Sequence, residues 1–253
     1  MHRELFADDL NRYNIFILGA YASGPYGLMS TSPVRTLEDM KGLKVRGTGI
    51  QSNYIKRLGG IPVGMRLAES YEGLMRGTID ASVGSLDYMR SYGFWDVCKY
   101  FTRLRFGSFN GGAEFTLTRD WFNSLPKVAR RAIVANYPIA LAGMTMEGYV
   151  HQERKTKQQA VEEKGVEILS PAPDLDAELQ KIIAEQVEDI VEIAVRQKGV
   201  NKEKATKIAS TYLELYEKWD KLANDVIKDD LNMFEKVLRD EIYNPFLLKL
   251  GLQ

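Results

Sequence analysis

One arginine in this 253-residue chain stands where a cation could bind an anionic ligand. Arg46 ends the segment 43–46, a predicted strand, and the turn 47–49 with two glycines follows it. Ligands of open α/β sheets gather at the carboxyl ends of strands, near helix N-termini whose free N–H groups favour anions. A guanidinium held there can bind a carboxylate through two parallel hydrogen bonds. A surface arginine paired with Glu38 or Asp39 would fit the same position, and position alone does not decide between the two.

The turn after Arg46 also has features of a dinucleotide-binding loop. Gly47 to Ser52 follows a predicted strand, opens a predicted helix and has Glu69 roughly 20 residues further on, as such loops require. Against this, Ser52 replaces the third glycine, and Lys44 and Arg46 alternate along a strand that should be continuously apolar. A nucleotide-binding enzyme that uses this turn is therefore the less favoured alternative.

Other groups that could catalyse a reaction or bind a metal are sparse. His2 is near the start, and Glu147 with His151 could share a helix face, but two ligands do not form a zinc site without a third. The sequence has no HExxH, CxxC, GxSxG or Walker A motif. We therefore predict no metal, no cofactor, no catalytic residue and no enzyme. Cys98 is the single cysteine, and its aromatic neighbours favour a small buried side chain over a reactive thiol.

The elements that must position Arg46 form an unbroken β-α-β-α-β pattern within 36–85. Thr36 is a predicted N-cap, with Asp39 in the first turn of a short helix. The expected strands and helices that follow are strand 43–46, helix 51–58, strand 61–65, helix 70–76 and strand 79–83. This alternation is typical of a mostly parallel sheet with helices on its faces, so the expected fold class is α/β.

Strands, crossings and a helical tail flank this pattern. The segments 13–19 and 114–118 read as strands, and 21–27 and 106–112 beside them read as crossings between two bodies. Helices are expected over about 124–136 and 139–164, a strand over 166–169, and amphipathic helices from 179 onward, the first ending at Gly199 and the next starting at Asn201. A chain of this length with these crossings favours two lobes.

The charge and hydropathy of the chain limit the kinds of partner that it can have. Lys plus Arg number 34 and Asp plus Glu number 34, so no net field attracts nucleic acid or an anionic membrane. No apolar run is long enough to span a bilayer, so we do not expect the chain itself to cross one. The first residues are charged and polar, and the sequence as given has no signal peptide.

The order of several short motifs resembles the solute-binding proteins of TRAP transporters, of the dicarboxylate-binding (DctP-type) family. Each motif is weak alone, whereas their order and spacing over about 15–169 are more specific. The motifs are LEDMKGLKVR at 37–46, LGGIP at 58–62 with Met65, E-x-Y-x-x-L at 69–74, GTID at 77–80, and FTLT at 115–118 followed by Trp121, Phe122, Leu125 and Pro126.

This resemblance implies a two-lobed α/β fold, like the type II periplasmic binding proteins, that closes on a small carboxylate such as a C4-dicarboxylate. It implies a periplasmic location and delivery of the ligand to TRAP membrane permease subunits. Arg46 aligns with the arginine that binds the carboxylate in this family. The other ligand-binding residues that we predict are Tyr26, Thr48, Leu67, Gly84, Ser85 and Tyr88.

The chain departs from the family pattern in three regions. Tyr26 stands about where a second basic residue is frequent, Gly84 and Ser85 where a carboxamide donor is common, and Leu67 where an aromatic residue is common. A carboxylate ligand is still expected, whereas the family's usual dicarboxylate or sialic-acid-like ligand is less expected.

The resemblance also suggests how the chain is divided. We assign 1–23 and 112–150 to a remnant of lobe I, 24–111 and 151–174 to lobe II with the ligand anchor, and 175–253 to long helices packing across both lobes. The family begins with a signal peptide and several further elements of the first lobe. We therefore expect a fragment, a misplaced start or a shortened relative with an incomplete first lobe. If ligand binding is lost, the alternative is an interaction scaffold.

Overall fold

Two compact units make up the structure, a computed structural model that describes residues 5–108 and 110–253. Unit 1 comprises 1–22, 110–148 and 189–253, and unit 2 comprises 23–109 and 149–188. Each unit is therefore assembled from segments that are distant in the sequence. The assignment of the units to lobes stays a prediction.

Unit 2 is built on a six-stranded mixed sheet of order β4-β3-β5-β2-β6-β8. Its strands are β2 (Tyr26–Ser30), β3 (Lys44–Arg46), β4 (Ile61–Val63), β5 (Ala81–Ser85), β6 (Tyr100–Thr102) and β8 (Glu167–Leu169). Strand β3 is parallel to β4 and β5, and β6 is parallel to β8, whereas β2 is antiparallel to both β5 and β6. The expected mostly parallel sheet is confirmed, with the one exception that the incoming strand β2 inserts antiparallel in the middle.

Short helices connect these strands, as the sequence predicts. They are α3 (Leu37–Met40), α4 (Ile50–Arg57), η1 (Leu67–Glu69), α5 (Ser70–Met75), α6 (Tyr88–Ser91), η2 (Phe94–Asp96) and α9 (Gln152–Glu162), with the start of α10 (Pro173–Lys198). The predicted N-cap of α3 is confirmed, because the Thr36 side chain accepts from the Asp39 N–H while the Asp39 carboxylate accepts from the Thr36 N–H. Strand β5 begins at Ala81 rather than Ile79, because the Ile79 N–H still donates to the Gly73 carbonyl after α5.

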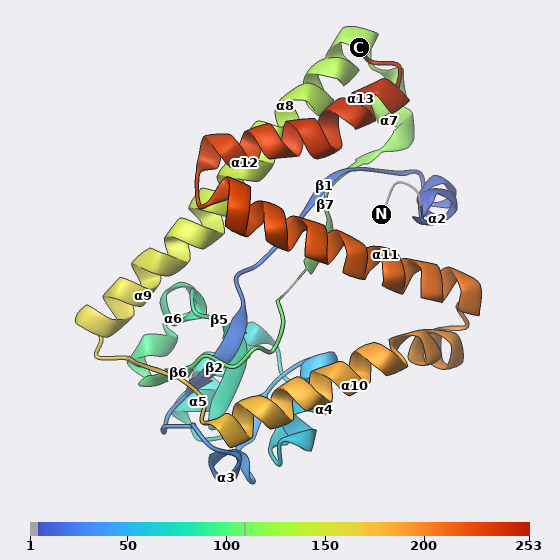
Figure 1. Ribbon diagram of the computed structural model, residues 1–253. Coiled ribbons are helices and arrows are strands. Elements are labelled where there is room, and N and C mark those ends of the chain that lie inside the picture. Colours follow the sequence, from blue (N-terminus) through green and yellow to red (C-terminus); the bar gives the residue numbers. More distant parts are fainter. Residues whose placement is uncertain (1–4, 109) are drawn as a thin grey trace. The chain divides into compact units, whose positions relative to one another are not determined.

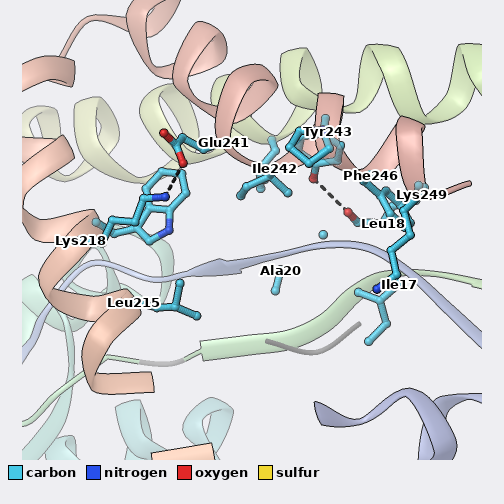
Figure 2. Close-up of a pocket in the computed structure, with 14 residues that line it drawn as sticks. Ile17, Leu18, Ala20, Leu215, Lys218, Glu241, Ile242, Tyr243, Phe246 and Lys249 are labelled. Carbon is cyan, nitrogen blue, oxygen red and sulfur yellow. Dashed lines mark hydrogen bonds and ion pairs between the residues drawn. The ribbon is translucent and has the colours of Figure 1, made fainter. Parts of the chain in front are cut away.

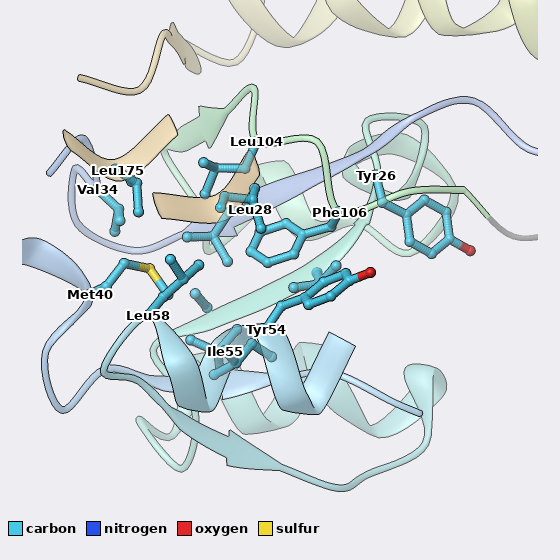
Figure 3. Close-up of a cluster of buried hydrophobic side chains, with 14 of the residues drawn as sticks. Tyr26, Leu28, Val34, Met40, Tyr54, Ile55, Leu58, Leu104, Phe106 and Leu175 are labelled. Atoms are coloured by element: carbon cyan, nitrogen blue, oxygen red, sulfur yellow. The ribbon is translucent and has the colours of Figure 1, made fainter. Parts of the chain in front are cut away.

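An apolar core fixes β3 and β5 from one side. Figure 3 shows side chains from α4, from the strands and from α10 converging on it, with Leu28, Ile55 and Leu175 fully buried. The rings of Tyr54 and Phe106 stack with centroids 6.4 Å apart. Burying a side chain of this size stabilises the fold by roughly 1.5–3 kcal/mol. The strand that carries Arg46 is therefore held rigidly.

A second cluster of unit 2 surrounds Cys98, which is buried as predicted. Burial raises the pKa of the Cys98 thiol to about 12, with Lys99 opposing the shift. Since the thiolate is the reactive form, Cys98 is expected to resist a thiol reagent such as DTNB in the native protein at pH 8 and to react on denaturation. Labelling in native buffer as fast as in 6 M guanidinium, a denaturing concentration for most domains, would contradict this placement.

Unit 1 contains a two-stranded antiparallel sheet of β1 (Ile15–Ala22) and β7 (Asn110–Thr118). Its helical elements (Figure 1) are α2 (Ala7–Arg12), α7 (Arg119–Ser124), α8 (Lys127–Thr145), the start of η3 (Met146–His151), the end of α10, α11 (Lys202–Lys221), η4 (Leu222–Ile227), α12 (Leu231–Leu238), η5 (Arg239–Tyr243) and α13 (Asn244–Lys249). The predicted boundary between α10 and α11 is confirmed, since Gly199 has φ +64° and the Asn201 side chain caps α11.

The expected break between helices 124–136 and 139–164 is wrong. Helix α8 runs from Lys127 to Thr145 through Pro138, which costs the helix one internal hydrogen bond. The face that carries Pro138 is buried, together with Val134 and Leu141, and packs in the apolar cluster of β1 and the C-terminal helices. This burial outweighs the lost hydrogen bond.

Candidate functional site

Arg46 is a buried cation without an acidic partner. It ends β3 with 9% of its surface exposed. Its guanidinium donates from Nε to the Met65 carbonyl and from Nη1 to the Val83 carbonyl, both at 3.4 Å. Among the side chains that the structure describes, no Asp or Glu forms an ion pair with it; Glu38 pairs with Lys41 instead. Two long hydrogen bonds leave most of its five donors available, so the group is prepared to bind an anion.

Tyr88 lies close enough to Arg46 for the two to interact electrostatically, and Tyr26 contacts Tyr88. The hydroxyls of Tyr26, which begins β2, and Tyr88, which begins α6, are 3.0 Å apart. Burial raises the pKa of Tyr88 well above its ordinary range, the Tyr26 hydrogen bond and the nearby Tyr92 add to this, and the Arg46 charge opposes it. Tyr88 therefore stays neutral and can donate a hydrogen bond to an anionic ligand.

Gly84 has a steric reason to be glycine. A Cβ atom at Gly84 would lie 2.4 Å from Cδ2 of Tyr88, because the tyrosine ring lies directly on β5. The position has no room for the carboxamide that the resemblance leads one to expect nearby. Ser85, the next residue of β5, is buried, and its hydroxyl accepts from the Asp87 N–H at 3.3 Å. Strand pairing sets Ser85 opposite Tyr26.

Thr48 and Leu67 lie at the margin of this group. Leu67 is half-buried in η1 and packs against the same apolar cluster as Tyr88. Thr48 is exposed in the turn two residues beyond Arg46. The structure thus brings Arg46, Tyr88 and the end of β5 together; their role in binding a ligand stays a prediction.

The turn that resembles a phosphate loop already uses its polar groups internally. The Thr48 N–H donates to the Gln51 side chain at 3.3 Å, and the Ser52 hydroxyl donates to the Gly47 carbonyl at 3.1 Å. A Cβ atom at Gly47 would lie 2.4 Å from Cδ1 of Ile55, so this glycine serves close packing of α4 on the strand. These contacts do not favour a nucleotide phosphate here.

Sequence reasoning missed an acidic group at the end of β5. Glu153, near the start of α9, is half-buried, and its Oε2 would lie 2.0 Å from a Cβ atom at Gly24. Asp87 accepts from the Thr156 hydroxyl at 2.9 Å and from Arg90 at 3.1 Å. Helices α6 and α9 lie side by side (Figure 1), although about 60 residues separate them in the sequence, so no local pattern could reveal this contact.

The Glu153 carboxylate costs stability in the ligand-free protein. Burial raises the pKa of Glu153, and the Asp87 carboxylate raises it further; Arg90 and Thr156 are engaged by Asp87. A folded pKa above the unfolded value destabilises the fold once pH rises past about 4.3. Glu153→Gln is therefore expected to raise the free energy of unfolding at pH 7, with the gain disappearing toward pH 4. Urea denaturation at both pH values checks this, with the exposed Glu163→Gln as the charge-matched control.

Unit 1 has a separate hollow of about 410 Å³ beside β1 and the C-terminal helices. Figure 2 shows that Lys218 pairs with Glu241 and that the Tyr243 hydroxyl donates to the Leu18 carbonyl at 2.9 Å. These polar groups are already satisfied within the fold, which makes the hollow a weaker candidate than the Arg46 site.

Two other kinds of site find no support in the described part of the chain. No group of three or more His, Cys, Asp or Glu side chains within 5–108 and 110–253 is placed to hold a metal ion. The same residues include no helix with the length and apolarity needed to cross a bilayer.

Comparison with known proteins gives a consistent result. Residues 2–193 match the family described as bacterial extracellular solute-binding protein, family 7. The 2,3-diketo-L-gulonate-binding periplasmic protein YiaO of Escherichia coli (strain K12) is 28% identical over 164 residues, which is 64% of this chain and 48% of that protein. The chain thus spans about half the length of this curated relative.

Solved structures show the same fold at low identity. A TRAP periplasmic solute-binding protein from Chromohalobacter salexigens with bound D-glucuronate has a TM-score of 0.64 and 23% identity over 83% of this chain and 67% of its own. One from Haemophilus influenzae with bound L-gulonate has a TM-score of 0.66 and 17% identity, also over 83% of this chain and 67% of its own. The predicted two-lobed α/β fold is confirmed, and the chain covers part of it.

Proposed function

The chain belongs to the bacterial extracellular solute-binding protein family 7, and we propose that it captures a small organic acid through Arg46 for a TRAP-type transporter. The membership confirms the resemblance that the sequence motifs indicate. The observation that carries the proposal is the buried guanidinium of Arg46, which has no acidic partner in the described residues and lies at the carboxyl end of β3. A buried cation of this kind is stabilised when a carboxylate binds it.

The neighbours of Arg46 suit a polyhydroxylated acid. Tyr88 can donate to the carboxylate, Ser85 and Tyr26 offer hydroxyls at the end of β5, and Leu67 gives an apolar wall. Thr48 lies in the turn that follows Arg46, and Gly84 leaves the space that the Tyr88 ring occupies. The relatives with bound D-glucuronate or L-gulonate make sugar acids the first ligands to test.

The wider role that we propose follows from the family. The protein acts outside the cytoplasm, in the periplasm, and passes its ligand to the membrane permease subunits of a TRAP transporter. Its relatives are binding proteins, and we propose that this chain likewise binds its ligand without changing it. A ligand shifts the equilibrium between the open and closed states of a binding protein to the extent that it binds the closed state more tightly.

Calorimetric titration with D-glucuronate and D-glucose tests this function. The two sugars differ at C6, where the carboxylate of D-glucuronate replaces a hydroxymethyl group. D-Glucuronate is expected to bind and to raise the melting temperature, as a ligand specific for the folded state must, whereas D-glucose is not. Equal binding of both sugars would overturn the carboxylate anchor. Binding of NAD in place of any acid would favour the nucleotide alternative, and no binding in a screen of acids would favour the scaffold.

A further inference from the structure

We propose that Glu153 makes this site select hydroxylated monocarboxylates and reject dicarboxylates. The inference rests on the proposed function, because it requires that Arg46 hold one carboxylate of the ligand. It proposes Glu153 as the residue that faces the end of the ligand away from Arg46, a role for which the sequence motifs indicate no residue. The assignment depends on where the Glu153 carboxylate lies, on what surrounds it and on its lack of a partner.

The Glu153 carboxylate lies over the backbone at the edge of the Arg46 group. A Cβ atom at Gly24 would meet Glu153 Oε2 at 2.0 Å and the Ser85 hydroxyl oxygen at 3.7 Å, so both oxygens face the same point. Ser85 pairs with Tyr26 in the sheet, and the Tyr26 hydroxyl lies 3.0 Å from that of Tyr88. Glu153 therefore lies near the end of β5, as does Tyr88, the tyrosine on which the Arg46 charge acts.

The Glu153 carboxylate can accept hydrogen bonds, but no donor among the described residues supplies one. Among the residues that the structure describes, Glu153 forms neither a hydrogen bond nor an ion pair. The nearest named acid, Asp87, already accepts from Thr156 and Arg90. A half-buried carboxylate without a donor is costly, and a ligand hydroxyl can supply the missing hydrogen bond.

Arg46 and Glu153 both lie near the end of β5, and among the described residues each lacks a partner of the opposite kind. The nine-tenths-buried guanidinium has no acid, and the half-buried carboxylate has no donor. A ligand with a carboxylate at one end and hydroxyls at the other meets both. A second carboxylate would instead face Glu153 with Asp87 close behind it, and like charges at such range repel in a partly desolvated site.

L-Gulonate and D-glucarate form a matched pair to test this selection. The two acids differ only at one terminal carbon, which is a hydroxymethyl group in L-gulonate and a carboxylate in D-glucarate. At pH 7.5 the wild-type chain is expected to bind L-gulonate more than about tenfold more tightly than D-glucarate. Glu153→Gln keeps a polar side chain of the same size without the charge and is expected to bring the ratio to within about threefold, mainly by tighter D-glucarate binding.

Two further variants distinguish a wrong role for Glu153 from a wrong carboxylate anchor. Glu163→Gln removes one charge from an exposed position after α9 and should leave the ratio unchanged. Arg46→Ala should weaken binding of both acids. If both acids bind through Arg46 but Glu153→Gln leaves the ratio as in wild type, the role of Glu153 is wrong and the proposed function stands. If neither acid binds the wild-type chain, or Arg46→Ala changes nothing, the carboxylate anchor fails and the inference fails with it.

Discussion

Arg46→Ala is expected to weaken binding of an organic acid by about 2–5 kcal/mol, roughly 30- to 4,000-fold in Kd. The substitution removes the guanidinium and leaves the ligand carboxylate in a desolvated place without its cation. Arg46→Lys is not expected to restore the affinity, since an ammonium cannot form the paired hydrogen bonds of a guanidinium. Isothermal titration with a sugar acid measures both effects.

Substitution of Arg46, which should weaken ligand binding, is not expected to destabilise the ligand-free protein. The ligand-free protein keeps the Arg46 charge buried with two carbonyl contacts and no acid, so Arg46→Met is expected to maintain or raise the melting temperature. Arg76→Met is the matched control, because Arg76 is an exposed arginine of unit 2 that pairs with Glu72. A variant at Arg46 that binds the acid as wild type does would show that the carboxylate is held elsewhere.

Gly84→Ala is expected to lower the free energy of unfolding by about 1–3 kcal/mol and to weaken ligand binding. The added methyl group would meet the Tyr88 ring at 2.4 Å and the Met29 side chain at 3.1 Å, so the ring must leave its position on β5. Gly64→Ala serves as the control. No atom lies within 4 Å of a Cβ atom at Gly64, and there alanine should be neutral or stabilise slightly by restricting the unfolded chain.

A double-mutant cycle shows whether the Tyr88 ring causes this loss. With Tyr88→Ala in place, the Gly84→Ala substitution has no ring to displace and should cost far less. The coupling free energy between the two positions is expected to exceed about 1 kcal/mol, as for side chains in direct contact. Additive losses in urea denaturation would mean that the methyl group acts through Met29 or the backbone instead.

The sequence could predict what short-range chemistry determines. The capping box at Thr36, the end of α10 before Gly199 and the position of Arg46 at a strand end all depend on residues within a few positions of one another. The antiparallel insertion of β2 depends on pairing with β5 and β6, which are distant in the chain. Propensity also misplaced the helix boundary at Pro138, where tertiary burial outweighs a local rule.

The residues of the candidate site also fall into those that the sequence could predict and those that it could not. Arg46 follows from its local context, and Tyr26, Ser85 and Tyr88 follow from where the resemblance places the ligand, although none of them lies in a quoted motif. Glu153 reaches the end of β5 from α9, after the chain has passed through unit 1, and neither spacing nor composition marks it. The contact of the Tyr88 ring with Gly84 likewise depends on atomic packing rather than on a residue pattern.

The pairing of β8 with β6 has a consequence for how the chain folds. Strand β6 ends at Thr102 and β8 begins at Glu167, and the unit 1 segment 110–148 lies between them in the sequence. Closing so long a loop costs entropy before any contact repays it, and such non-local pairing slows folding. During synthesis, the edge of β6 stays open until the ribosome has released residues 167–169. Unit 2 can therefore become fully protected from protease only after most of the chain has been made.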